Sequence, residues 1–202
     1  MKLYYTPGAC SLASHIALQE SGFPFEIDKL NASTKTTSAG EDYLQINPKG
    51  YVPAIRLNNG IVLTECAVIL QYIADQKPDS GLAPKAGTME RYRLQEWLNF
   101  IGTEIHKSYG PLFNKTTTDE VKNSARILLS KRLAYVESQL ANKPYLMGSN
   151  FTVADAYMFV TLSWSDHAGF DLSQFPRIEE YVAKIRIRPA VHAAMKAEGL
   201  IK

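Results

Sequence analysis

The first 30 residues constrain the fold of this chain most, because their patterning changes from strand to helix and back. Residues 2–6 form a short apolar run that predicts a buried strand, and Pro7-Gly8 ends it. Residues 11–20 have helical character, which Ser21-Gly22 stops, and residues 25–30 alternate apolar and polar side chains as a second strand. A strand, a helix and a strand in this order form the unit that gives a parallel strand pair.

The following stretch extends this unit with an antiparallel pair and a helix. Residues 31–50 are polar and rich in turn formers. Residues 52–57 predict a third strand, Asn58-Asn59-Gly60 a hairpin turn, and residues 61–63 a fourth strand. We expect a helix over residues 64–75, with Thr64 as its cap. The order βαβ followed by ββα is that of a thioredoxin-like domain.

A break in composition divides the chain into two domains. Residues 78–87 are rich in Pro, Gly and Ser, and the pattern after them is helical, with no convincing strand beyond residue 64. We predict a thioredoxin-like domain over residues 1–80, a linker over 81–87 and an all-helical domain over 88–202. The expected fold class is therefore an α/β thioredoxin-like N-terminal domain joined to an all-α helical-bundle C-terminal domain.

Apolar spacing predicts two long helices early in the second domain. The first places Trp97, Leu98, Ile101 and Ile105 on one face, and Gly110-Pro111 is expected to kink or end it. The stripe of the second comprises Val121, Ala125, Leu128, Leu129, Arg132, Val136 and Leu140. Later, Thr152-Val-Ala-Asp155 predicts a capping box that opens an apolar helix, and further helices follow over residues 175–187 and after Pro189.

Composition excludes several classes of protein. The net charge of +2 is too small to indicate a nucleic-acid partner, and no window approaches 18 uninterrupted apolar residues, so no membrane span is expected. The N-terminus lacks a signal-peptide pattern, and two cysteines in 202 residues fit a reducing compartment, which we expect to be the cytoplasm. The four histidines are scattered, so no metal site is predicted.

Cys10 is the sharpest chemical feature, because it follows a strand and a Pro-Gly turn and begins a helix. The positive end of a helix dipole lowers the pKa of a thiol, and the amides there bind anions. Ser11-Leu12-Ala13 follow, so there is no C-x-x-C and no redox cycle of two cysteines within this motif. The alternative is that Cys10 is a small buried apolar residue, as cysteines often are.

Two further positions near strand ends carry possible binding groups. Val52-Pro53 is either an ordinary trans proline at the start of a strand or the cis proline of a thioredoxin-like fold, whose preceding residue presents its backbone to a peptide ligand. Glu65 lies near a helix N-terminus, where it can bind an ammonium group, while the amides and the side chain at Cys66 can take a carboxylate. The alternative for Glu65 is a plain first-turn glutamate favoured by the helix dipole.

The first helix of the second domain carries a polar set beside its apolar face. The spacing of Asn99, Thr103 and His106 predicts that these side chains lie on one face and line a cleft. The alternative for His106 is a surface histidine or a core histidine with its hydrogen bonds satisfied.

These signals occur together in the order of one family. The motifs are Met1-Lys-Leu-Tyr-Tyr-Thr-Pro-Gly-Ala-Cys-Ser11, Ile46-Asn-Pro-Lys-Gly-Tyr-Val-Pro53, Leu63-Thr-Glu-Cys-Ala-Val-Ile-Leu-Gln-Tyr-Ile-Ala-Asp75, Glu96-Trp-Leu-Asn-Phe100, Glu104-Ile-His-Lys107 and Phe151-Thr-Val-Ala-Asp-Ala-Tyr157. Through them the chain closely resembles the beta-class glutathione transferases of bacteria over nearly its whole length. The resemblance implies a cytosolic glutathione transferase fold.

The resemblance also implies a glutathione site. Cys10 is expected beside the glutathione sulfur, Lys35 at the glycyl carboxylate, and the backbone of Val52 at the cysteinyl part. Glu65 and Cys66 are expected to hold the γ-glutamyl end. The implied site is completed by Asn99, Thr103, Glu104, Ile105 and His106. Position 66 is commonly Ser in this family, and the thiol found here is a weaker hydrogen-bond donor.

The activity that the resemblance implies is transfer of glutathione sulfur to small hydrophobic electrophiles, with glutathione as co-substrate and no metal. A homodimer is also implied, with some of the site crossing its interface. One alternative is that Cys10 itself forms a mixed disulfide with glutathione and gives thiol-disulfide or peroxide reductase activity. Another is a non-enzymatic binding or regulatory protein of the same fold, against which the presence of Cys10, Val52-Pro53 and Glu65 argues.

A thiolate needs stabilisation at neutral pH, and three groups are candidates: the helix amides at residues 10–12, His106 and Tyr5. We expect a cation at His106, helped by Lys107, to lower the pKa of Cys10. Cys10 and Cys66 are expected to contact opposite ends of glutathione, too far apart for a disulfide.

Overall fold

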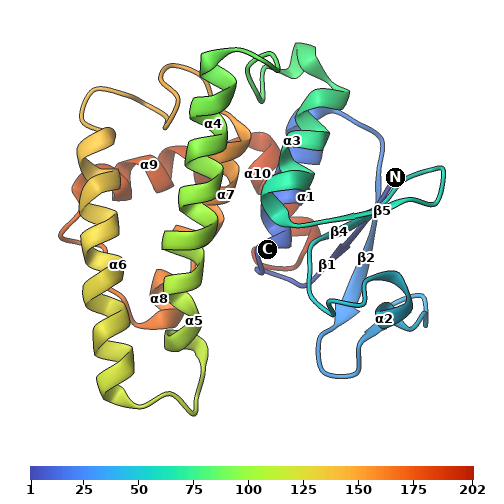
Figure 1. Cartoon of the computed structure of the whole chain (residues 1–202), viewed down its shortest axis with the longest axis horizontal. Helices are drawn as coiled ribbons and strands as arrows, with labels where there is room; N and C mark the ends of the chain where they lie inside the picture. The colour runs from blue at the N-terminus through green and yellow to red at the C-terminus, as the bar shows by residue number, and fades with distance from the viewer. The chain divides into compact units, whose positions relative to one another are not determined.

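The chain, described over all 202 residues by a computed structural model, divides into two compact units (Figure 1). The first unit consists of Met1–Ala83 together with Ile187–Lys202, and the second of Pro84–Arg186. The boundary near residue 83 falls within the predicted linker. The assignment of the C-terminal segment differs from the prediction. Residues 187–202 belong to the first unit and not to the helical one.

The first unit is built on a five-stranded sheet of order β3-β2-β1-β4-β5. Its strands are β1 (Lys2–Tyr5), β2 (Glu26–Asn31), β3 (Thr36–Thr37), β4 (Ala54–Arg56) and β5 (Val62–Thr64). β1 pairs in parallel with β2 and antiparallel with β4, and β4 pairs antiparallel with β5. The predicted βαβ and ββ order is confirmed. β3 was not predicted, because two residues within a Ser/Thr-rich stretch show no alternation of apolar and polar side chains.

Helices cover both faces of this sheet. They are α1 (Ser11–Ser21), α2 (Tyr43–Ile46), α3 (Cys66–Gln76), the 3-10 turn η1 (Pro78–Ser80) and α10 (Pro189–Ala197). Figure 1 shows α1 and α3 together on one face and α2 on the other. α1 packs against both α3 and α10, which explains why the C-terminal segment joins this unit. On the α2 side, Tyr43 and Ile46 share a buried cluster with Tyr4 and Val52.

The second unit contains only helices. They are α4 (Met89–Phe100), the π-helical segment η2 (Ile101–His106), α5 (Lys107–Phe113), α6 (Asp119–Gln139), α7 (Val153–Leu162), α8 (Ser165–Ala168) and α9 (Pro176–Arg186). α4, η2 and α5 follow one another without a break, and α5 continues through Pro111 to Phe113, so of the predicted kink or end at Gly110-Pro111 the end is wrong. Pro111 has no backbone N–H to donate, and the fully buried Tyr109 before it stacks on Phe113 after it, with ring centroids 6.1 Å apart. None of the helices combines the length and apolar character that crossing a membrane needs.

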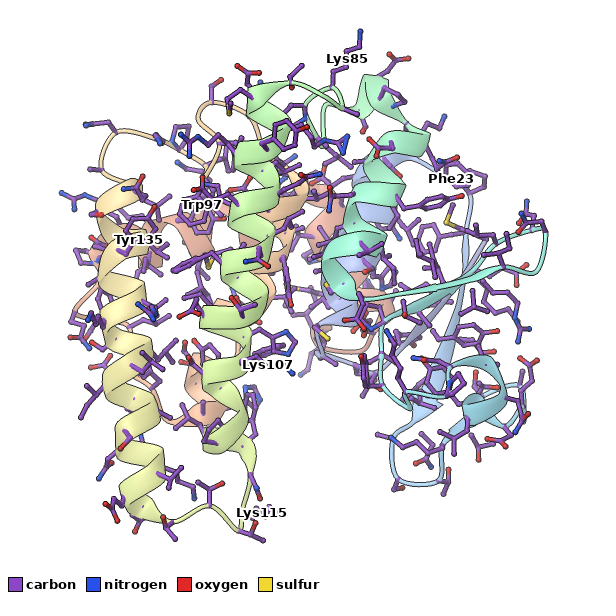
Figure 2. The ribbon with its side chains drawn as sticks, viewed as in Figure 1. Phe23, Lys85, Trp97, Lys107, Lys115 and Tyr135 are labelled. Carbon is purple, nitrogen blue, oxygen red and sulfur yellow. The ribbon has the colours of Figure 1, made fainter.

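The inward face of α6 differs in part from the predicted stripe. Ala125, Leu129, Leu133 and Val136 are buried, whereas Val121 and Leu128 are exposed. Figure 2 shows Trp97 of α4 and Tyr135 of α6 turned toward one another, with ring centroids 5.9 Å apart. The two long helices of this unit are therefore in contact through aromatic side chains as well as through the buried stripe.

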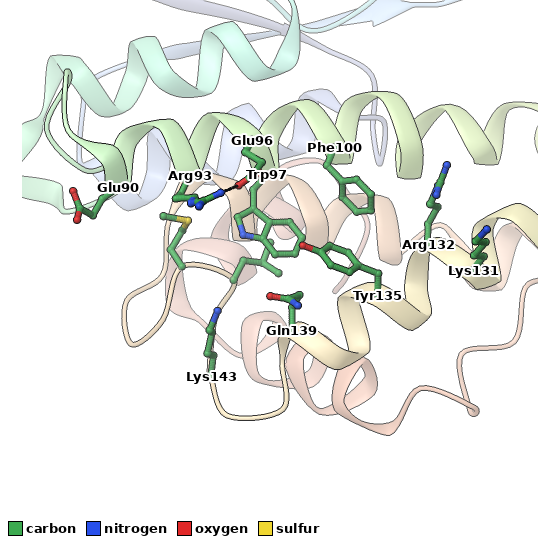
Figure 3. Close-up of a pocket in the computed structure, with 12 residues that line it drawn as sticks. Glu90, Arg93, Glu96, Trp97, Phe100, Lys131, Arg132, Tyr135, Gln139 and Lys143 are labelled. Carbon is green, nitrogen blue, oxygen red and sulfur yellow. Dashed lines mark hydrogen bonds and ion pairs between the residues drawn. The ribbon is translucent and has the colours of Figure 1, made fainter.

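A cavity of about 770 Å³ opens beside this aromatic contact (Figure 3). Trp97, Phe100 and Tyr135 form its aromatic part, and their rings meet at centroid distances of 5.5 to 5.9 Å. Charged side chains surround them, with Arg93 and Glu96 joined by an ion pair of 2.9 Å. None of the residues predicted to bind glutathione lines this cavity.

The start of α7 confirms the predicted capping box. The Thr152 side chain and the Asp155 side chain each bond the other's backbone at this helix end. Asp155 is fully buried and also accepts hydrogen bonds from the Leu146 amide at 2.8 Å and the Tyr181 hydroxyl at 2.9 Å. Burial raises the pKa of the Asp155 carboxyl, while these donors act in the opposite direction. The residue therefore joins three segments of the helical unit.

Candidate functional site

Cys10 lies where the sequence predicts, in the turn between β1 and α1, and is the N-cap residue of α1. The turn is held by its own backbone, because the Ala9 amide donates to the Thr6 carbonyl at 3.0 Å. The Ser11 hydroxyl donates to the same carbonyl and accepts from the Thr6 amide, both at 3.2 Å. The free, partly buried Cys10 thiol donates to the Val52 carbonyl oxygen at 3.3 Å.

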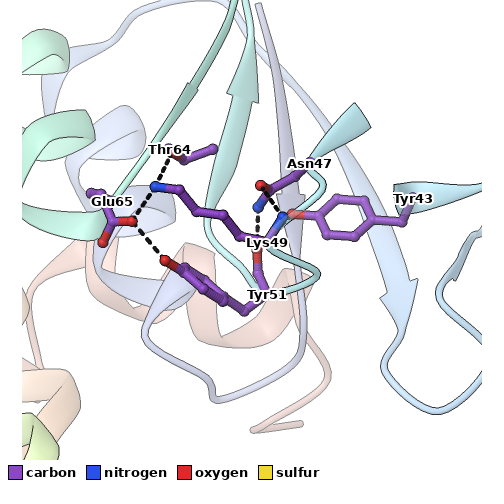
Figure 4. Close-up of polar contacts among 6 residues, drawn as sticks. All are labelled: Tyr43, Asn47, Lys49, Tyr51, Thr64 and Glu65. Carbon is purple, nitrogen blue, oxygen red and sulfur yellow. Dashed lines mark hydrogen bonds and ion pairs between the residues drawn. The ribbon is translucent and has the colours of Figure 1, made fainter. Parts of the chain in front are cut away.

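The Val52-Pro53 peptide bond is cis, as expected of a thioredoxin-like fold. The segment before it is held by two side chains of the α2 region (Figure 4). The Tyr43 hydroxyl and the Asn47 amide both donate to the Tyr51 carbonyl, at 2.9 and 2.7 Å. The Val52 backbone is thus fixed from one side while its carbonyl oxygen faces the Cys10 thiol.

Glu65, and not Thr64 as predicted, is the N-cap residue of α3. Its φ of 73° lies in the left-handed region, which residues other than glycine rarely adopt. Figure 4 shows that its carboxylate meets Lys49 and Tyr51, with the tyrosine hydroxyl donating at 2.7 Å. The same Lys49 ammonium donates to the Thr64 hydroxyl oxygen at 3.0 Å.

This network changes the titration of its members. The hydrogen bond to Glu65 raises the pKa of both the Lys49 ammonium and the Tyr51 hydroxyl, so both groups are protonated at neutral pH. Neither residue was singled out from the sequence. The available signal was their position in the motif Ile46-Asn-Pro-Lys-Gly-Tyr-Val-Pro53, one of those that carry the family resemblance.

Cys66 is buried at the start of α3, and its thiol is 3.5 Å from the Cys10 carbonyl oxygen. Burial, and secondarily the neighbouring Cys10, raise the pKa of the Cys66 thiol well above its usual value. Both cysteines are free. The two residues lie closer together than expected, because α1 and α3 pack side by side and bring their first residues together, while their contacts with opposite ends of glutathione stay a prediction.

Lys35 belongs to the loop after β2 and has a φ of 56°, again in the left-handed region. Its ammonium donates to the Gly50 carbonyl at 2.7 Å. The structure therefore brings Lys35 to the segment that carries Lys49, Tyr51 and Val52. Tyr5, which was considered as a donor to a sulfur anion, is instead buried with its ring 6.1 Å from that of His15.

The other predicted site residues lie around η2 in the helical unit. The Thr103 hydroxyl donates to the Asn99 carbonyl at 3.1 Å, and both residues are exposed. Glu104 forms an ion pair of 2.6 Å with Arg132, and the Ile105 side chain is fully buried.

His106 is half-buried and contacts aromatic residues of the same unit. Its Nδ1 is 2.7 Å from the Tyr157 hydroxyl, and its ring contacts Trp164 edge-on at a centroid distance of 4.8 Å. Burial, helped by the charge of Lys107, lowers the pKa of His106 to about 4. The imidazole is therefore neutral at pH 7, and the expectation of a cation at His106 is wrong.

The described side chains include no group of three or more His, Cys, Asp and Glu residues able to hold a metal ion. Cys10, Lys35, Val52, Glu65 and Cys66 belong to the first unit, and Asn99, Thr103, Glu104, Ile105 and His106 belong to the second.

Comparison with protein families matches both halves of the chain. Residues 8–76 match the N-terminal domain of glutathione S-transferases, and residues 100–189 match their C-terminal domain. Glutathione S-transferase GstA of Escherichia coli O157:H7 is 44% identical over 99% of this chain and 100% of its own length.

Solved structures agree with these matches. A sphingomonad glutathione S-transferase complexed with glutathione is 49% identical, with a TM-score of 0.96 over 100% of both chains. The bacterial beta-class glutathione S-transferase of Sphingomonas chungbukensis is 48% identical, with the same TM-score and coverage. The predicted fold class and the predicted family resemblance are both confirmed.

Proposed function

Because this chain belongs to the glutathione S-transferase family and is a transferase enzyme, we propose that it joins the sulfur of glutathione to small hydrophobic electrophiles. The observation that supports this most is the meeting of a thiol, a peptide and a carboxylate where α1 and α3 begin. Cys10 contacts the Val52 carbonyl, Cys66 contacts the Cys10 carbonyl, and Glu65 is the residue immediately before α3.

Each of these groups suits one part of a γ-glutamyl-cysteinyl-glycine ligand. The Val52 carbonyl is an acceptor for the cysteinyl amide, and the Glu65 carboxylate attracts the γ-glutamyl ammonium. The amides at the start of α3, with the Cys66 thiol, suit the carboxylate of the same γ-glutamyl group. Lys35 supplies a cation for the glycyl carboxylate, and Cys10 faces the sulfur.

The chemical step requires a glutathione thiolate. The sulfur loses its proton, attacks an electrophilic carbon and forms a thioether, while a leaving group departs or a double bond accepts the electron pair. Since His106 is neutral and Tyr5 is buried, we assign stabilisation of the sulfur anion to the positive end of α1.

A second activity is favoured by the free Cys10 thiol at the same helix start. In it, the Cys10 thiolate attacks the glutathione sulfur of a mixed disulfide between glutathione and another thiol, forms a Cys10–glutathione disulfide and releases the other thiol as its thiolate. A glutathione thiolate then attacks this disulfide, releases the Cys10 thiolate and leaves as oxidised glutathione, so the other thiol is reduced at the expense of glutathione. Mass spectrometry of the protein after exposure to oxidised glutathione tests this step, and a Cys10 peptide that gains no glutathione contradicts it.

We extend the glutathione site to Asn99, Thr103, Glu104, Ile105 and His106 on the strength of the family membership. Ile105 is fully buried, so its backbone is the part available for such a role. Substituting Asn99 or Thr103 by alanine tests this extension through the glutathione KM, because both are exposed and neither side chain supports the core.

We also propose that the protein is a cytoplasmic homodimer. Exposed apolar side chains on α4 and α6 support self-association, among them Tyr92 at 57% and Ile127 at 73% exposure. Sedimentation at micromolar concentration should give twice the 22.5 kDa chain mass. A particle of chain mass only, at every concentration tested, would refute the dimer.

Retention on immobilised glutathione followed by a conjugation assay with an aryl halide tests the main proposal. We expect the wild type to be retained and active, and Glu65→Gln to be retained less. Glu26→Gln is the matched control, because Glu26 is an exposed glutamate of the same unit outside the site. A folded protein that is neither retained nor active contradicts the proposal.

A further inference from the structure

A buried carboxylate lies immediately after α10, on the segment that joins the first unit. The Glu198 side chain has no exposed surface. One of its oxygens accepts from the Gly8 amide at 2.9 Å, and the other is 3.0 Å from Nδ1 of His15. A buried carboxylate needs such partners, and hydrogen bonds to an ionised acceptor are stronger than those between neutral groups.

The amide that Glu198 binds belongs to the turn that carries Cys10. Gly8 has a φ of 70°, and a Cβ built on it would lie 3.4 Å from the Leu200 side chain. The segment after α10 therefore covers this turn. Because Thr6 is hydrogen-bonded to both Ala9 and Ser11, on either side of Cys10, a displacement of Gly8 moves the whole turn and with it the thiol of Cys10.

The second partner of Glu198 fixes the carboxylate to the middle of α1. His15 is almost fully buried, with its ring between those of Tyr5 and Phe25 at centroid distances of 6.1 and 5.5 Å. It has no place in the proposed glutathione site. Glu198 thus ties the rigid middle of α1 to the turn that precedes this helix.

The other end of α10 is anchored differently. Arg188 forms a two-pronged ion pair with Glu20, with distances of 2.6 and 3.0 Å, near the C-terminal end of α1. This pair holds the same two helices together but does not touch the Cys10 turn. One carboxylate therefore holds each end of α10, Glu20 at its start and Glu198 after its end. Because only Glu198 contacts the Cys10 turn, a substitution of Glu20 is a matched control for a substitution of Glu198.

We propose that Glu198 is a positioning residue for Cys10. By holding the Gly8 amide it keeps the turn in the conformation that sets the Cys10 thiol against the Val52 carbonyl. The relevance of this to catalysis rests on the proposed function, in which Cys10 faces the glutathione sulfur. The positioning itself is a property of the free protein and is measurable without glutathione.

The test is the rate at which iodoacetamide alkylates Cys10 at fixed pH, followed by peptide mass spectrometry below the unfolding temperature. We expect Glu198→Ala to raise this rate at least about threefold, because the loosened turn releases the thiol from Val52. Glu20→Ala should leave it within about twofold of the wild type while lowering the thermal midpoint. Glu198→Gln should restore the wild-type rate, because its amide oxygen still accepts from Gly8 and its NH₂ donates to His15.

An unchanged rate in Glu198→Ala, or an equal rise in Glu20→Ala, overturns the proposal. If Glu198→Ala does not fold, the rate of hydrogen exchange at the Gly8 amide of the wild type tests the contact with Glu198 instead. Exchange as slow as that of α1 amides supports the contact, and exchange at the rate of an open turn refutes it. The two proposals can fail separately. If the variants show the expected alkylation rates but the wild type has no conjugation activity, the proposed function is refuted and the positioning role of Glu198 stands.

Discussion

Acidification should destabilise this protein partly through His106, and the size of the effect follows from its surroundings. The pKa of the buried imidazole is lowered to about 4 from 6.5, so between these values the unfolded chain binds a proton that the folded chain does not. Stability contributed by neutral His106 is therefore present above pH 6.5 and is lost as the pH falls toward 4. At pH 5 the loss relative to pH 7 amounts to about 2 kcal/mol.

Urea unfolding of the wild type and His106→Asn at pH 7 and pH 5 measures this loss. Asparagine keeps a polar group near the Tyr157 hydroxyl and does not titrate, so the drop in unfolding free energy should be smaller by about 2 kcal/mol in the variant. His167→Asn is the matched control, because His167 is exposed on α8 of the same unit. Equal pH dependence in the wild type and His106→Asn would show that folding does not lower the pKa of His106.

Three further predictions concern the core and the proposed site. Asp155→Ala should lower the unfolding free energy by roughly 3–5 kcal/mol, because it orphans the Leu146 and Thr152 amides and the Tyr181 hydroxyl; a loss below about 1 kcal/mol in urea unfolding contradicts this. Glu65→Gln should weaken glutathione binding, measured by calorimetry, while leaving the thermal midpoint unchanged. Lys49→Met should strengthen glutathione binding a few-fold at most, because Lys49 forms an ion pair with the Glu65 carboxylate in the free chain. No gain in affinity in Lys49→Met would show that Lys49 does not compete with glutathione for Glu65. In the folded protein, iodoacetamide should label Cys10 and not the buried Cys66, and equal labelling of both thiols would contradict the burial at the start of α3.

Local patterns predicted those elements whose signals are contained in a few neighbouring residues. The hairpin at Asn58-Asn59-Gly60 joins β4 and β5, with Gly60 at a φ of 85° as such a turn requires. The capping box at Thr152 and the position of Cys10 at the start of α1 were likewise predicted from the order and spacing of neighbouring residues. In each case the hydrogen bonds that form the element link residues close in the chain.

Features that depend on tertiary packing were not readable in this way. Pro111 indicated a helix end, but the packing around Tyr109 carries α5 past it. The approach of Cys66 to Cys10 follows from the packing of α3 on α1, which no local pattern encodes. The same holds for the neutral state of His106, because its pKa is set by burial.

The proposed site was predicted mainly through the family resemblance, since each of its residues had an ordinary structural alternative. Lys49 and Tyr51 were missed because a lysine and a tyrosine near a turn are common surface residues. Only the folded backbone, with Glu65 in a left-handed conformation, shows that both side chains meet one carboxylate.

The return of residues 187–202 to the first unit sets an order of events during synthesis. The whole helical unit, Pro84–Arg186, is translated between the two parts of the sheet-containing unit. At ordinary rates of translation this interval lasts on the order of ten seconds, during which His15 has been made and its carboxylate partner has not. The helical unit is thus the first whose residues are all available to fold, and the contact between Glu198 and the turn that carries Cys10 forms only after Glu198 leaves the ribosome.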